Sequence, residues 1–122
     1  MKIRIVIGGL SVEAELNDTP TARRISAVLP LRTSFNTWGE EIYFPLPVEA
    51  DLDGSAREEV QEGDLGYWPD GNAFCIFFGP TPASRPGKII PASAVNLIGR
   101  VMGDARRFKG VMEEKEVLLE VL

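Results

Sequence analysis

The chain has 122 residues, of which 44% are hydrophobic and 25% are charged, a composition typical of a single globular domain and not of a disordered chain or a disulfide scaffold. Its 13 basic and 18 acidic residues give a net charge of −5, which argues against nucleic acid or anionic lipid as the main partner. The chain contains no histidine, so imidazole catalysis and histidine-based zinc sites are excluded.

Residues 2–16 predict a β-hairpin, because apolar side chains alternate with polar ones on both sides of a Gly8-Gly9 turn. A short amphipathic helix of about ten residues follows. Asp18 or Thr19 caps this helix, Pro20 occupies its first position and Pro30 ends it. We expect the helix to cover one end of a sheet structure, because it is too short to form a helical core.

The central part of the sequence predicts strands separated by turns. Residues 34–47 have strand character, although Gly39 and the two prolines near the end of the stretch restrict it to an irregular or edge position. Residues 49–64 are strongly acidic and indicate a solvated surface excursion. Residues 65–78 predict a second hairpin, whose second strand is apolar on both faces and is therefore expected to be central.

The last third of the chain begins with a proline-rich stretch, residues 79–93, which predicts a long surface loop because proline lacks the donor that regular structure needs. A strand at 95–102, a helical turn at 104–108 and a terminal strand at 117–122 are expected after it. With many short strands and no alternation of strand and helix, residues 1–122 predict one mainly β domain, a closed or nearly closed antiparallel barrel with one capping helix. Pairing of the first strand with the last would close the barrel.

The motif search yields no nucleotide loop and no Cys-x-x-Cys pair, so we expect no cofactor and no metal. The segment from Asp51 to Glu62 imitates the spacing of a calcium loop, but Ala56 stands where the sharp turn requires glycine, and we interpret the segment as a solvated acidic loop. Glu40 and Glu41 are adjacent on a predicted strand and should point to opposite faces, which prevents them from sharing a proton.

The single cysteine, Cys75, lies in the most apolar run of the chain, where a buried structural thiol is favoured over a nucleophile. It cannot form an internal disulfide, which is consistent with a reducing compartment. No run reaches the ~18 apolar residues of a spanning helix, and the first residues do not read as a signal peptide. These features lead us to expect a cytoplasmic protein with no membrane partner.

Four stretches in chain order carry a more specific signal. They are Asp18-Thr-Pro-Thr-Ala-Arg-Arg-Ile, Gly39-Glu-Glu-Ile-Tyr43, Gly63-Asp-Leu-Gly with Asn72-Ala-Phe-Cys-Ile-Phe-Phe78, and Val95-Asn-Leu-Ile-Gly-Arg-Val101. In these stretches the chain resembles the cyclophilin-like superfamily, and more closely a small prokaryotic branch of uncharacterised cyclophilin-like proteins. The resemblance implies an eight-stranded closed barrel capped by helix.

The chain departs from the prolyl isomerases of this fold in the segment that would supply the catalytic arginine. In those enzymes a Phe-His-Arg strand carries it, whereas here residues 31–38 are too few for a full strand of this kind, and Arg32 has no such context. Val95 stands where a pocket histidine would align, and the glutamine of the family's Gln-Phe-Phe-Ile motif is absent.

We therefore favour a noncatalytic module that binds a peptide or a small apolar ligand at an aromatic mouth of the barrel. Weak peptidyl-prolyl isomerase activity, with Arg32 or Arg85 replacing the lost arginine, is the alternative, and a subunit of a larger enzyme assembly is a third reading. The candidate ligand-binding residues are Arg32, Trp38, Tyr67, Trp68, Phe77 and Arg85.

Overall fold

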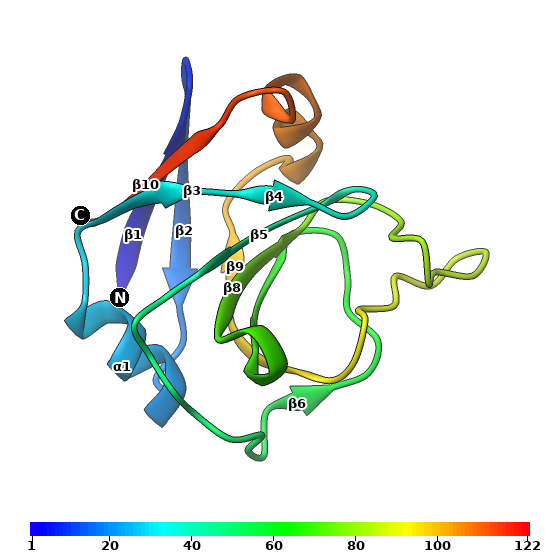
Figure 1. The fold of residues 1–122 in the computed structure, drawn as a ribbon, viewed down its shortest axis with the longest axis horizontal. Helices are drawn as coiled ribbons and strands as arrows, with labels where there is room; N and C mark the ends of the chain where they lie inside the picture. Colours follow the sequence, from blue (N-terminus) through cyan, green and yellow to red (C-terminus); the bar gives the residue numbers. More distant parts are fainter.

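The strands form one antiparallel sheet that curls into a nearly closed barrel (Figure 1). The structure, a computed structural model, describes residues 1–122. The strands are β1 (Lys2–Ile7), β2 (Leu10–Leu16), β3 (Leu31–Ser34), β4 (Asn36–Thr37), β5 (Glu41–Pro45), β6 (Ala56–Arg57), β7 (Asp64–Trp68), β8 (Ala73–Phe77), β9 (Val95–Val101) and β10 (Glu116–Val121). The helical segments are α1 (Pro20–Ala27) and two 3-10 segments, η1 (Pro69–Gly71) and η2 (Ala105–Val111).

The order of strands around the barrel is β3-β10-β1-β2-β9-β7-β8-β5-β4, with β6 added beside β9. The first and last strands pair as predicted, with Ile5 opposite Leu119. Both ends of this order belong to one stretch of chain, because β3 and β4 are separated only by Phe35. β3 pairs with β10 and β4 pairs with β5, so this stretch joins the two ends of the sheet across the top of Figure 1.

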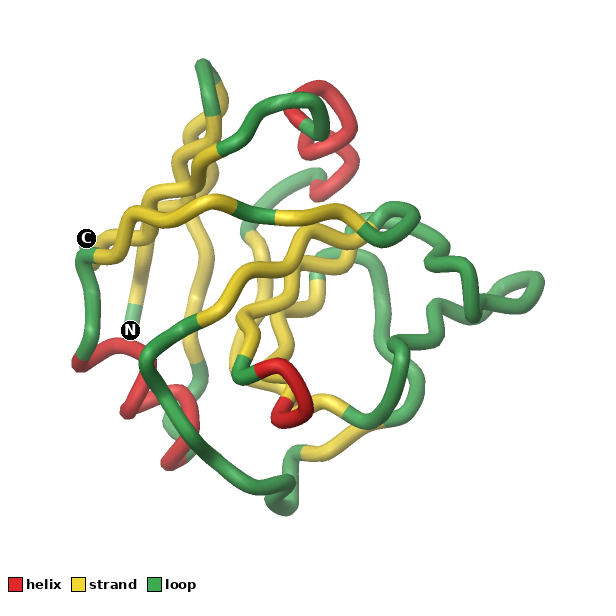
Figure 2. Tube along the Cα trace, viewed as in Figure 1, coloured by secondary structure: helices red, strands yellow, loops and turns green.

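The helix α1 begins and ends close to the predicted positions but is shorter than expected, with eight residues. Thr19, not Asp18, caps it, and its side chain accepts a hydrogen bond from the backbone N–H of Ala22 at 3.3 Å. Ala22 and Ile25 are buried and belong to the barrel core, so the helix covers one end of the barrel (Figure 2). None of the helices combines the length and the hydropathy needed to cross a bilayer.

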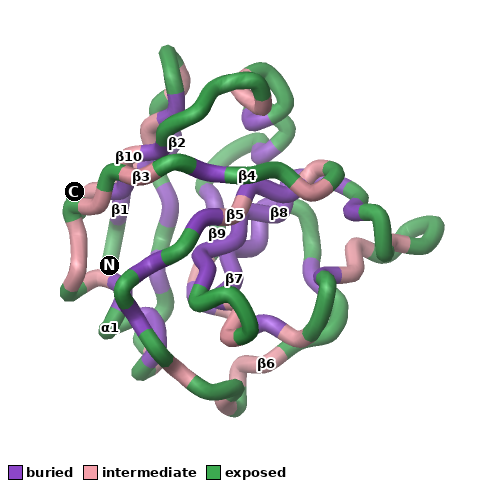
Figure 3. The backbone as a smooth tube through the Cα atoms, viewed as in Figure 1, coloured by how far each residue is buried: buried purple, intermediate pink, exposed green.

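The apolar side chains form two clusters, one on each face of the barrel wall. Figure 3 shows that the strands carry most of the buried residues, whereas the projecting turns and loops are largely exposed. The large cluster of 24 residues fills the interior, and alternate residues of every long strand enter it. A smaller cluster lies on the outer face of β7, β8 and β9 and consists of Val60, Ala73, Cys75, Phe77 and Val95. β8 is therefore buried on both faces, as its sequence predicted for a central strand.

Two short strands were not predicted. β3 arises in residues 31–34, which alternate between half-buried and exposed and pair with β10, a segment far away in the sequence. β6 lies in the acidic stretch that was expected to be wholly solvated, where it pairs with β9, and Val60 just beyond it is buried. This stretch is thus a loop attached to the barrel wall rather than a free surface excursion.

Candidate functional site

An apolar pocket of about 200 Å³ lies on the outer face of the barrel wall, beside the smaller apolar cluster. Its lining residues are Trp38, Glu41, Tyr43, Trp68, Cys75, Pro91, Ala92 and Val95. They come from β5, β7, β8 and β9, from the turn before β5 and from the loop before β9. The pocket therefore lies on the outer face of the barrel wall and not at an end of the barrel, where the aromatic mouth was expected.

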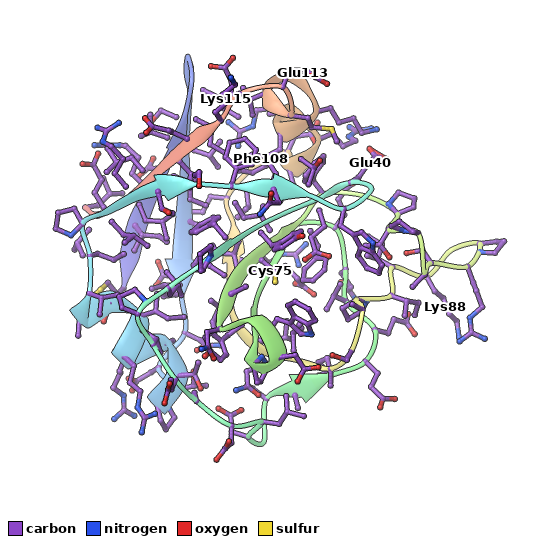
Figure 4. All side chains as sticks on the ribbon, in the orientation of Figure 1. Glu40, Cys75, Lys88, Phe108, Glu113 and Lys115 are labelled. Atoms are coloured by element: carbon purple, nitrogen blue, oxygen red, sulfur yellow. The ribbon has the colours of Figure 1, made fainter.

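The strand register determines which side chains reach this pocket. Ile42 and Phe44 on β5 point into the barrel core, so the residues that alternate with them, Glu41 and Tyr43, lie on the outer face. Tyr43 pairs with Cys75 of the central strand β8, which brings a third side chain to the same face. Figure 4 shows Cys75 in the middle of the sheet.

The wall formed by Trp68 is held in a defined orientation. Its indole Nε1 donates a hydrogen bond to Ser93 Oγ at 2.6 Å, and Ser93 Oγ donates to Asp70 Oδ2 at 3.1 Å. The polar edge of the ring is satisfied by this chain of hydrogen bonds, which leaves the ring's apolar surface to line the pocket.

The loop of residues 79–94 forms the opposite wall through Pro91 and Ala92. The loop is cross-linked by Ser84, whose Oγ accepts hydrogen bonds from the backbone N–H of Thr81 at 2.9 Å and of Ile90 at 3.0 Å. Ile89 O accepts from the backbone N–H of Val60 at 3.0 Å, which attaches the loop to the smaller cluster. These contacts fix the backbone that precedes Pro91, although the tip of the loop, where Lys88 lies, projects from the molecule (Figure 4).

The turn that presents Trp38 depends on Gly39. This residue has a φ of +62°, and a Cβ at its position would lie 2.8 Å from the carbonyl oxygen of Pro80. Glycine is required here on both counts. The turn is completed by a hydrogen bond of 2.9 Å from the backbone N–H of Trp38 to the carbonyl oxygen of Glu41.

Glu41 is the one charged residue that lines the pocket, and it is 6% exposed. Its Oε1 is buried without a hydrogen-bond partner. Burial raises the pKa of Glu41 to about 7, and the neighbouring Cys75 thiol opposes part of this rise. The carboxyl is therefore divided between its protonated and ionised forms near neutral pH, an arrangement found more often at functional sites than elsewhere.

The thiol of Cys75 is not suited to nucleophilic chemistry. Burial raises its pKa well above the ordinary value, and the adjacent Glu41 carboxylate raises it further. A thiolate is the reactive form of cysteine, and this environment disfavours it. The side chain is a structural part of the pocket floor, as the apolar sequence around it indicated.

Glu40 illustrates the opposite environment one residue away. Its Oε2 lies 3.1 Å from Lys109 Nζ, in an ion pair that is half exposed to solvent. The two adjacent glutamates therefore have different environments, because Glu40 is paired with Lys109 whereas Glu41 lines the pocket without a partner for its Oε1. The structure brings together no group of three His, Cys, Asp or Glu side chains that could hold a metal ion.

The architecture described above is shared with known proteins. The family model of cyclophilin-like proteins matches residues 1–120. The chain belongs to the cyclophilin-like family. A hypothetical protein, AF2241, from Archaeoglobus fulgidus, whose solution structure is known, is 39% identical over 100% of this chain and 95% of its own, with a TM-score of 0.83.

A more distant cyclophilin-like fold occurs in McbB, whose structure was solved in complex with tryptophan. It has a TM-score of 0.70 and 15% sequence identity over 98% of this chain, and the chain spans 44% of the length of McbB. No curated protein sequence matches the chain.

Within this cyclophilin-like barrel, only Trp38 and Trp68 of the six predicted site residues line the pocket. Tyr67 is fully buried in the barrel interior, where its hydroxyl donates to Val48 O at 2.6 Å. Phe77 is also fully buried, in the cluster beneath the pocket. The predictions that Tyr67 and Phe77 line a surface pocket are wrong, because neither side chain reaches the surface. Alternation along a strand shows which residues share a face, but it does not show which face is covered by another segment of the chain.

Neither of the two predicted arginines lines the pocket of this cyclophilin-like chain. Arg32 is exposed on β3 and lines a separate polar hollow with Lys115 and Glu116. Arg85 lines a shallow hollow that shares Pro91 and Ala92 with the aromatic pocket. Sequence reasoning missed Glu41 and Tyr43 as pocket residues, although the alternation with Ile42 and Phe44 was a usable signal.

Proposed function

We propose that this protein is a noncatalytic binding module whose outer pocket receives one apolar group of a peptide or of a small ligand. The observation that carries the proposal is a concave apolar site, walled by Trp38, Tyr43 and Trp68, into which a single unsatisfied carboxyl group is built. A few polar groups within an apolar hollow are the usual composition of a small-ligand site.

The size of the pocket supports a small occupant. Its volume of about 200 Å³ is below the ~300–1,000 Å³ of sites for drug-sized molecules, so one side chain or one ring is the fitting unit. The solved complex of McbB with tryptophan supports a ligand of this scale in a protein that contains the same fold, at low sequence identity. The free and buried Cys75 supports a reducing location such as the cytoplasm.

Titration of the protein with benzyl alcohol and with indole, followed by ¹⁵N-resolved NMR, tests this proposal. We expect saturable shifts of the Trp38 and Trp68 indole resonances and of the Ala92 amide, with dissociation constants of about 1 mM. Ala92 is exposed on the pocket wall, so A92W fills the hollow without disturbing the barrel core and should abolish the shifts.

Ala83 is exposed on the same loop and does not line the pocket, which makes A83W the matched control. It should bind as the unaltered protein does. Linear shifts without saturation at either ring, or binding that persists in A92W, would remove the basis for a binding module.

Weak peptidyl-prolyl isomerase activity is the second candidate, supported by the one arginine near the pocket, Arg85. Such an enzyme lowers a barrier of about 18–20 kcal/mol by holding proline in an apolar site while a fixed donor favours the twisted amide. Exchange NMR on a proline-containing peptide measures the activity. Acceleration that disappears in R85A would establish this candidate, and no acceleration at high protein concentration would end it.

A further inference from the structure

One oxygen of the Glu41 carboxyl has no hydrogen-bond donor, because no side chain of the pocket supplies one. Its Oε1 is buried and unpartnered, whereas the neighbouring indole N–H of Trp68 is already used by Ser93. The Cys75 thiol lies close enough to the Glu41 carboxyl to oppose part of the rise in its pKa, but it leaves Oε1 without a partner and also lies 3.9 Å from the Ala73 carbonyl oxygen. A buried polar group without a partner costs about 1–3 kcal/mol, so a ligand that brings a donor gains from satisfying it.

The remaining walls indicate what kind of donor this would be. Three aromatic side chains line the same pocket as the carboxyl, and the faces of aromatic rings attract cations, most strongly where water is excluded. No lysine or arginine lines the pocket, and Lys109, close by in the fold, is engaged by Glu40. With a carboxylate, three aromatic rings and no lysine or arginine in its lining, the pocket has a negative electrostatic potential, which attracts a cation.

We propose that the occupant of the pocket carries a single ammonium group on an apolar body, and that this group pairs with Glu41 between the aromatic walls. The inference rests on the proposed binding function and adds the charge and chemical class of the ligand. The ammonium could belong to a small amine or to the lysine side chain of a peptide, because both present the same group on an apolar stem.

The affinity for an ammonium ligand should depend on pH through the protonation state of Glu41. Tyr43 and Cys75 are the other titratable groups that line the pocket, and burial together with the Glu41 carboxylate raises the pKa of the Cys75 thiol well above its ordinary value. With a carboxyl pKa of about 7, the ionised fraction rises about tenfold between pH 6 and pH 8. The affinity for an ammonium ligand should rise by the same factor, whereas that for a neutral ligand should not change.

The experiment compares benzylamine, benzyl alcohol and benzoate, which share one ring and differ in charge, by calorimetric titration at pH 6 and pH 8. We expect benzylamine to bind at least tenfold more tightly than benzyl alcohol at pH 8, and benzoate to bind most weakly. In E41Q the preference for benzylamine should shrink to about twofold, with binding of benzyl alcohol retained as evidence that the pocket is intact.

E40Q is the matched control, because it removes the same charge one residue away at a position that does not line the pocket. It should keep the full preference. Equal binding of benzyl alcohol and benzylamine, or tighter binding of benzoate, would overturn the ammonium ligand while leaving the binding function in place. Absence of binding by all three compounds would overturn the binding function as well.

A further arm identifies the source of the ammonium group. An end-blocked Gly-Lys-Gly peptide presents the lysine side chain without a free amino terminus. Tighter binding of this peptide than of benzylamine would assign the site to lysine side chains, and weaker binding would assign it to small amines. Either result supports an ammonium ligand, provided that the preference is lost in E41Q.

Discussion

Glu41 and Cys75 are diagonal neighbours on the outer face of the barrel wall, because Tyr43 pairs with Cys75 and Glu41 pairs with Phe77 in the β5–β8 ladder. Two acidic groups thereby share one poorly solvated region: the Glu41 carboxylate raises the pKa of the Cys75 thiol, whereas the thiol opposes part of the rise that burial causes in the pKa of Glu41. The pair provides the floor of the pocket and determines how the protein responds to pH.

Stability should fall as the pH rises through the titration of Glu41. A carboxyl whose pKa is about 7 in the folded state and near 4.5 otherwise binds its proton more tightly when folded, so the folded state is favoured below pH 4.5 and penalised progressively up to pH 7. The penalty corresponds to about 3 kcal/mol. Urea unfolding should show E41Q gaining about that much relative to the unaltered protein between pH 4.5 and pH 8.

The control for this measurement is E40Q, in which a half-exposed, paired glutamate is replaced. Its free energy of unfolding relative to the unaltered protein should change by less than about 1 kcal/mol over the same pH range. A pH-independent difference between E41Q and the unaltered protein would show that folding does not raise the pKa of this carboxyl.

Cys75 should resist thiol reagents in the folded protein. The thiol is 1% exposed and its pKa is raised by burial and by Glu41, so both access and thiolate concentration are low. We expect reaction with Ellman's reagent at pH 8 to be at least 100-fold slower than in urea. E41Q should accelerate the reaction, because it removes the charge that opposes thiolate formation, and equal rates in the two proteins would contradict this coupling.

Asn96 should be among the most sensitive polar positions. It is fully buried on β9; its Oδ1 accepts from Asp53 N–H at 2.9 Å, and its Nδ2 donates to Asp51 O at 2.9 Å and to Thr21 Oγ1 at 3.2 Å. The bonds to Asp51 and Asp53 attach the acidic loop to the barrel, and N96A removes all three hydrogen bonds together with the side chain that fills this buried site. A loss of about 2–4 kcal/mol is expected in chemical denaturation.

An exposed asparagine offers the comparison for this substitution. Asn17 Nδ2 also donates to a backbone carbonyl, that of Leu97 at 2.8 Å, but solvent can replace it. N17A should cost about 1 kcal/mol or less. If N96A proved no more damaging than N17A, the buried network would not be what fixes the acidic loop.

Gly99 should not tolerate a side chain. A Cβ at this position on β9 would lie 2.2 Å from the carbonyl oxygen of Glu15 on the paired strand β2, a collision with backbone that cannot move aside without disturbing the ladder. G99A should therefore lower the free energy of unfolding by about 1–3 kcal/mol or more. A Cβ at Gly9 would have no atom within 4 Å, so G9A should have nearly the same melting temperature as the unaltered protein. Thermal unfolding of both variants is the measurement.

The fold could be predicted where residues encode their own environment. Alternation in residues 2–16 identified β1 and β2, and the apolar run at 74–78 identified a strand buried on both sides. β3 was missed because its four residues contain a single large apolar side chain, and their extended conformation depends on pairing with β10. Such pairing between distant segments has no local signature.

The site was less predictable than the fold. Trp38 and Trp68 were proposed as aromatic residues at the mouth of the barrel, but Tyr67 was proposed on the same ground and is buried in the core. Tyr67 differs from Trp68 because successive residues of β7 face opposite sides of the barrel wall, and Tyr67 faces the interior. The hollow beside Trp38 and Trp68 depends on the path of the loop at 79–94, which supplies Pro91 and Ala92 to it. Loop paths depend on contacts such as those of Ser84, which the composition of the loop does not reveal.

The position of the two tryptophans has a practical consequence. They are the only tryptophans of the chain, and both lie in the walls of the same hollow. The protein thus contains its own optical reporter: its intrinsic fluorescence originates where a guest would reside, and occupancy can be followed by emission intensity or wavelength without attaching a dye.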